Sequence, residues 1–229
     1  MTLSPLRIVD PFVKLKRALD NHIFRTYRYL RVGMAVLAGA LPFLLLIVGG
    51  IYGIHVQDTM SHYYHVNDTT RNLFVGILWA LGVFLVLYVG INRWENGLLN
   101  LAGFCAVGVA MVPMAYKCDP ACPAISWLHG VFALIVFFSI AIVCFLGARN
   151  EARESKYRFW YWAFSLFMIL GPATAFVLTR VFHIREYVFL AETAGFLAFA
   201  AYWGTKTAEL WETEEGLRMS RLPSRAVGA

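Results

Sequence analysis

Histidine, serine and glutamate side chains occur in two short segments at spacings that suit metal binding. One segment contains Ser61, His62 and His65, so that a helix would bring the residues three and four positions apart onto one face. Two imidazoles at such a spacing supply half of a zinc site. His183 and Glu186 repeat the three-residue spacing further along the chain. The candidate metal ligands are His62, His65, His129 and His183.

The chemistry expected of such a site is metal-assisted hydrolysis. Zinc held by three histidines, or by two histidines and a glutamate, with water in the open position is a catalytic arrangement. Glu186 or Glu192 would then act as the general acid or base, and Ser61 would orient a ligand or transfer a proton. The alternative is that each histidine is a solvated or hydrogen-bonded surface residue with no metal.

Copper is the alternative metal, because softer sulfur ligands occur near the same segments. These are Met60, Met111, Met114, Cys118 and Cys122. The last two cysteines are also close enough in sequence to pair with each other, and an oxidising outer face favours that disulfide over metal ligation. Cys105 and Cys144 lie inside apolar stretches, where cysteine is an inert packing residue.

Glu192 is an acid inside a predicted membrane span. A carboxylate facing lipid at this depth is unfavourable by about 2–3 kcal/mol even on lenient insertion scales, so we expect Glu192 to face the interior of the bundle. His129 is predicted to begin its own span at a similar depth and is the preferred partner, with Arg180 and Arg185 as alternatives. A structural hydrogen bond between helices is the competing interpretation of this residue.

The elements that must position these residues are predicted to be transmembrane helices. Hydrophobic residues make up 59% of the 229 residues, charged residues 15%, and the mean hydropathy is +0.61. A soluble domain is about one-half apolar and one-quarter charged, so this composition excludes a soluble enzyme, a disordered chain and a disulfide-dense secreted module. The sequence predicts an all-α, polytopic membrane protein with a six-helix bundle. The predicted spans are 32–52, 73–91, 98–116, 125–146, 159–178 and 187–204.

Lysine and arginine are unequally distributed between the two sides of these spans. Sixteen of the twenty lie on the side that carries both termini, and four lie on the other side. The positive-inside rule therefore predicts that both termini are cytoplasmic, in a plasma membrane or a bacterial inner membrane. Five of the six histidines then map to the outer side. Because topology accounts for the net charge of +6, no nucleic-acid partner is expected.

The two ends of the chain are predicted to lie in the cytoplasm. Residues 1–31 form an amphipathic segment whose helix begins at Asp10 and Pro11 and lies on the membrane surface or against a partner subunit. Residues 205–229 form a tail, of which 205–217 continue the last span as a helix. Three prolines inside predicted spans are expected to kink them: Pro42, Pro113 and Pro172.

The element Ser61-x-x-x-His65, shortly before the second span, resembles the Ser-x-x-x-His element of the alkaline ceramidase, progestin-receptor-like and adiponectin-receptor-like superfamily. Those proteins are seven-span, zinc-dependent lipid amide hydrolases and their relatives, so the resemblance implies that Ser61 and His65 belong to a zinc site. The family's final His-x-x-x-His pair has only His183-x-x-Glu186 as a counterpart here, and six spans are predicted instead of seven. The Met-Ser-His-Tyr run from Met60 is also similar to Met-His-Tyr-Thr sensor domains, which implies copper.

Two functions therefore stay open on the sequence alone. The first is an outward-facing, metal-dependent hydrolase of a lipid-like substrate. The second is a non-catalytic membrane protein, such as an accessory subunit, sensor or small transporter, whose polar cluster is structural or binds a ligand or ion. The expected partners are the lipid bilayer, a lipid-like small molecule and other membrane subunits. No ATP-binding loop, dinucleotide fingerprint or c-type haem motif occurs in the sequence.

Overall fold

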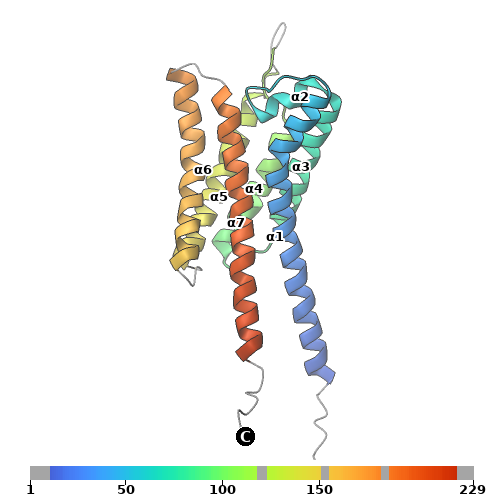
Figure 1. Ribbon diagram of the computed structural model, residues 1–229, viewed down its shortest axis with the longest axis vertical. Coiled ribbons are helices and arrows are strands. Elements are labelled where there is room, and N and C mark those ends of the chain that lie inside the picture. The colour runs from blue at the N-terminus through green and yellow to red at the C-terminus, as the bar shows by residue number, and fades with distance from the viewer. Residues whose placement is uncertain (1–10, 118–122, 151–154, 182–185, 221–229) are drawn as a thin grey trace, which may run out of the picture.

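The computed structural model describes residues 11–117, 123–150, 155–181 and 186–220. Within these ranges the only regular structure is helical (Figure 1). A 3₁₀ helix, Met60–His62, and the short helix α2, Tyr63–Val66, connect the first two long helices. The long helices are α1 (Pro11–Ile51), α3 (Asp68–Leu87), α4 (Arg93–Met111), α5 (Trp127–Asn150), α6 (Ser155–Val181) and α7 (Glu186–Ser220).

The six long helices form a closed ring. Each packs against the next one along the chain, and α7 packs against α1, which completes the ring. Successive helices run in opposite directions, so that α2, the end of α4 and the start of α5 lie at the same end of the molecule (Figure 1). We call this the α2 end. The opposite end, where α1 and α7 extend beyond the other helices, is called the terminal end.

Four stretches in these helices are long and apolar enough to cross a membrane: His22–Ile51, Asp68–Leu87, Trp127–Arg149 and Lys156–Thr179. Large apolar side chains such as Phe43, Phe104 and Phe159 are at least half exposed on the outside of the ring, as lipid-facing residues are. The prediction of an all-α protein with membrane-spanning helices is therefore confirmed at this level. The count of six spans is not confirmed, because polar residues in α4 and α7 lower their hydropathy.

Helix α4 is displaced by five residues from the predicted span 98–116. It begins earlier because the Asn92 side chain accepts hydrogen bonds from the backbone N–H groups of Trp94 and Glu95, which is an N-cap. It ends earlier because Pro113 disfavours helical backbone at the preceding residue, Val112, which is extended. Pro113 therefore terminates the helix and does not kink it, whereas Pro42 and Pro172 lie inside α1 and α6.

Helix α1 is continuous from Pro11 to Ile51, so no break separates an interfacial segment at residue 31 from the first span. The separate amphipathic helix is therefore not confirmed. At its other end α1 stops in a Schellman arrangement: Ile54 N–H donates to the Gly49 carbonyl, and Gly53 takes a φ of 68°. Helix α7 continues to Ser220, as the pattern over 205–217 predicted.

Glycines set the closest helix contacts. A Cβ added to Gly103 would lie 2.6 Å from the carbonyl oxygen of Gly82, and the reciprocal distance is 2.8 Å, so α3 and α4 touch backbone to backbone. On α7, a Cβ at Gly195 would lie 2.4 Å from the Phe137 ring of α5. These contacts bring α3, α4, α5 and α7 close enough to surround the site described next.

Candidate functional site

Ser61 and His129 form a hydrogen-bonded pair at the α2 end. The Ser61 Oγ atom lies 2.8 Å from His129 Nε2, and both residues are buried. Ser61 is placed by the 3₁₀ helix, which begins where the Thr59 side chain accepts the N–H of His62. His129 is in the first turn of α5. Sequence reasoning selected both residues but paired Ser61 with His65 by spacing.

The second ring nitrogen of His129 determines its tautomer. His129 Nδ1 lies 2.7 Å from the carbonyl oxygen of Val112, which only accepts hydrogen bonds, so Nδ1 carries the proton in the neutral ring. Nε2 is then an acceptor, and the Ser61 hydroxyl donates to it. The Val112 carbonyl has no partner within α4, because the helix ends at Met111, one residue before Val112. It is therefore available to accept the hydrogen bond from His129. The arrangement is that of a serine nucleophile and a histidine base held by a third group.

Glu192 on α7 lies inside the bundle at the same end as Ser61. Its Oε2 accepts a hydrogen bond of 2.6 Å from the backbone N–H of Met60, the residue before Ser61. The carboxylate therefore faces inward and joins α7 to the 3₁₀ helix. Its hydrogen-bond partner is the Met60 backbone and not His129, because His129 uses its two ring nitrogens for Ser61 and Val112.

An apolar cavity of about 80 Å³ lies beneath this cluster. Ser61 and Glu192 line one end of it, and apolar side chains line the remainder, down to Leu85 on α3, Ile140 on α5 and Phe199 on α7. Phe74, Leu78, Leu81 and Leu85 line it from one face of α3, at helical spacing. The cavity therefore combines a polar end with an apolar wall, a lining of the kind that ligand-binding pockets have.

His62 and His65 lie against Tyr116 at the same end of the molecule. Both rings contact Tyr116: the ring centroids are 4.7 Å apart for His62 and 5.2 Å apart for His65, whose ring is stacked on the tyrosine. His65 Nε2 also lies 3.0 Å from the carbonyl oxygen of Met114. The two histidines therefore share a face, as predicted, but the group that they share is an aromatic ring.

The described residues contain no group of three or more His, Cys, Asp or Glu side chains that would hold a metal ion. His183, Cys118 and Cys122, as well as the side chain of Glu186, lie outside the described residues. The sulfur atoms of Met111 and Met114 accept hydrogen bonds from Trp79 and Thr59, so they do not converge either. The predicted zinc or copper site and the predicted disulfide therefore stay predictions.

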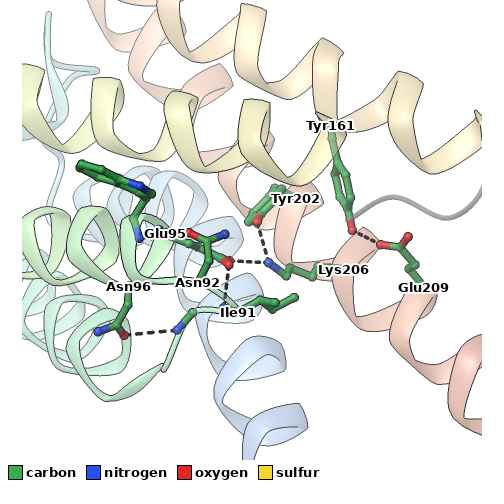
Figure 2. Close-up of polar contacts among 10 residues, drawn as sticks. Ile91, Asn92, Glu95, Asn96, Tyr161, Tyr202, Lys206 and Glu209 are labelled. Carbon is green, nitrogen blue, oxygen red and sulfur yellow. Dashed lines mark hydrogen bonds and ion pairs between the residues drawn. The ribbon is translucent and has the colours of Figure 1, made fainter. Parts of the chain in front are cut away.

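A second polar cluster, which sequence reasoning missed, lies at the terminal end (Figure 2). Lys206 on α7 forms an ion pair of 2.5 Å with Glu95 on α4, and their side chains are only 3% and 2% exposed. Lys206 also donates to the Tyr202 hydroxyl, at 3.2 Å, and Glu95 accepts from the backbone N–H of Ile91, at 2.8 Å. This cluster joins α7 to the start of α4.

A sequence signal for this cluster exists. Asn92 and Glu95 have the Asn-x-x-Glu spacing of a capping box, which places a helix start at 92 and a carboxylate in its first turn. Tyr202, Lys206 and Glu209 recur at helical spacing along α7, and Glu209 accepts a hydrogen bond of 2.6 Å from Tyr161 on α6. The spacing identifies the face of each helix, but only packing shows that the two faces meet.

Comparisons with protein-family models, with curated proteins and with solved structures found no match. The function therefore has to be inferred from the geometry of the site itself.

Proposed function

We propose that this chain is an integral membrane protein whose six long helices cross the bilayer with both termini in the cytoplasm, and that it hydrolyses a lipid-like substrate with Ser61 and His129. The observation that carries the proposal is the hydrogen bond of 2.8 Å between Ser61 Oγ and His129 Nε2 at the polar end of an apolar cavity. With this orientation, the α2 end faces outward.

The reaction follows from the protonation state of His129. As Ser61 Oγ bonds to the carbonyl carbon of the substrate, its proton passes to Nε2, and the Val112 carbonyl stabilises the imidazolium through Nδ1–H. The tetrahedral intermediate then breaks its bond to the leaving group, which takes the proton from Nε2. Water, deprotonated by the same nitrogen, attacks the acyl-serine, releases the acid and restores Ser61.

The lining of the cavity favours a substrate with an apolar chain. The wall of the cavity below Ser61 and Glu192 is apolar, so water leaves it readily. Each Å² of apolar surface that a chain buries there would make the free energy of binding more favourable by about 25 cal/mol. Glu192 would accept a hydrogen bond from a hydroxyl or amine of the head group, since its Oε2 already accepts one from Met60 at this end. The substrate class is therefore an acyl ester or amide with a donor-bearing head group.

A second candidate function follows from a different property of the same contacts. The hydrogen bonds of Ser61, His129 and Glu192 also join the 3₁₀ helix to α5, α7 and the end of α4. A non-catalytic protein would use them to close the α2 end over a bound lipid. In that case, loss of the Ser61 hydroxyl would lower the stability of the protein, and neither wild-type protein nor the variant would hydrolyse esters.

The test is hydrolysis of acyl esters of increasing chain length by the full-length protein in detergent micelles, together with labelling by a fluorophosphonate, which reacts with activated serines. Ser61→Ala should reduce hydrolysis at least 10³-fold and abolish labelling, and His129→Gln should act similarly because it removes the base. Wild-type protein should prefer esters whose chains fill the cavity.

Ser165→Ala is the matched control, because Ser165 is also buried and also makes one hydrogen bond, of 2.9 Å, to the Ala141 carbonyl. It should leave hydrolysis and labelling unchanged. Wild-type protein that neither hydrolyses the esters nor reacts with the probe would refute the serine hydrolase. If Ser61→Ala in addition lowered the melting temperature more than Ser165→Ala does, the non-catalytic function would be supported.

A further inference from the structure

Arg31 on α1 is a buried cation at the terminal end. The residue is only 7% exposed, its Nε atom is buried, and no described residue accepts a hydrogen bond from it or forms an ion pair with it. Burying an unpaired charge costs several kcal/mol, whereas a paired charge recovers most of that cost. The burial of Arg31 is therefore explained most simply by an anion that is not part of the chain.

Two contacts between α1 and its neighbours place Arg31 along the bundle. Two residues after it, a Cβ on Gly33 would lie 2.6 Å from the Phe84 ring of α3. One turn before it, the Tyr27 ring contacts the ring of Tyr88, directly after α3, at a centroid distance of 5.5 Å. Arg31 therefore lies opposite the last turn of α3, between these two contacts.

Trp203 on α7 offers a second donor at the same level. Its side chain is fully buried, and its indole N–H has no hydrogen-bond partner. Its ring lies 4.8 Å, between centroids, from the ring of Tyr88, which also contacts Tyr27 one turn from Arg31. Tyr88 therefore connects Trp203 to the turn of α1 that precedes Arg31.

Among the residues that the structure describes, the two buried acids at this end have partners other than Arg31. Glu95 is paired with Lys206 and also accepts the Ile91 N–H, while Glu209 accepts the hydroxyl proton of Tyr161. These carboxylates are thus held by other groups and form no ion pair with Arg31. The site therefore has an excess of donors over acceptors, which is the property of an anion-binding site.

We propose that Arg31 binds the phosphate group of a membrane phospholipid. Helix α3 has 20 residues, about 30 Å in length, which equals the thickness of the hydrocarbon core. A residue opposite its last turn therefore lies at the depth of the head groups. An arginine fork matches two phosphate oxygens, and basic pockets between helices on the cytoplasmic side bind anionic head groups.

The test measures the melting temperature of the full-length protein, delipidated in dodecyl maltoside, while phosphatidylglycerol is added. Diacylglycerol with the same chains, which lacks the phosphate, and inorganic phosphate are added in parallel. Phosphatidylglycerol at 100 times its Kd should raise the melting temperature by about 5–10 °C, and diacylglycerol should not. Arg31→Gln should lose most of this shift.

Arg25→Gln is the matched control, because Arg25 is an exposed arginine on the same helix and the change in charge is identical. It should keep the shift. If Arg31→Gln does not fold, Arg31→Lys retains the charge without the fork and should still reduce the shift. A full shift in the Arg31 variant that folds, or no shift in wild-type protein, would overturn the site. An equal shift with inorganic phosphate alone would overturn the lipid as its source.

Discussion

Removing the Lys206 ammonium should be among the most destabilising single changes at the terminal end. Lys206 and Glu95 are almost completely buried, so water screens their attraction very little. Lys206→Met keeps the length and apolar stem of the side chain but leaves the Glu95 carboxylate with the Ile91 N–H as a partner and no cation. Breaking a buried pair in this way costs about 3–5 kcal/mol.

That free energy corresponds to a fall in the melting temperature of about 6–20 °C, since 1 kcal/mol shifts the midpoint of a chain of this size by about 2–4 °C. The assay is thermal unfolding in detergent micelles at constant protein and detergent concentrations. The double variant Lys206→Met/Glu95→Gln should recover most of the loss, because an amide leaves no uncompensated charge and still accepts the Ile91 N–H.

The exposed pair Lys156–Glu212 is the control. Its N–O distance is 3.3 Å, but the side chains are 53% and 54% exposed, so Lys156→Met should lower the melting temperature much less than Lys206→Met does. Hydrogen bonds from Tyr157 and Lys156 hold the pKa of the Glu212 carboxyl below its usual range. If Lys206→Met were as mild as Lys156→Met, or if the double variant were no more stable than the single one, the reasoning from burial would be refuted.

Three further predictions concern other parts of the protein. Glu192→Gln keeps the shape of the side chain and an acceptor for Met60 N–H, so the melting temperature should change by less than about 4 °C. Hydrolysis should fall, because the variant lacks the carboxylate that would bind the head group of the substrate. Unchanged hydrolysis would remove Glu192 from the site. Gly103→Val should destabilise by at least about 1–3 kcal/mol in the same unfolding assay, since its Cβ would lie 2.6 Å from a carbonyl of α3; a neutral effect would contradict that packing. Cys118 and Cys122 should be oxidised to each other, and mass spectrometry of non-reduced protein that finds two free thiols would exclude the disulfide.

Composition and hydropathy alone predict the class of structure. An apolar composition with few charges requires helices in a membrane-like environment, because each backbone polar group of a helix is satisfied inside the same segment. The cost of a lipid-facing carboxylate likewise predicted the inward orientation of Glu192, which accepts a hydrogen bond inside the bundle. These properties are local or additive along the chain, so they need no knowledge of which helices are neighbours.

The tertiary structure alone decided which polar groups meet. Helical spacing joined Ser61 to His65, but Ser61 bonds to His129, 68 positions away, because α5 packs where α4 ends at Met111. Glu95 lies between two predicted spans, and only the packing of the bundle brings Lys206 to it from 111 positions away. Periodicity shows which residues share a face of one helix, whereas contacts between helices depend on the order and register in which faces pack.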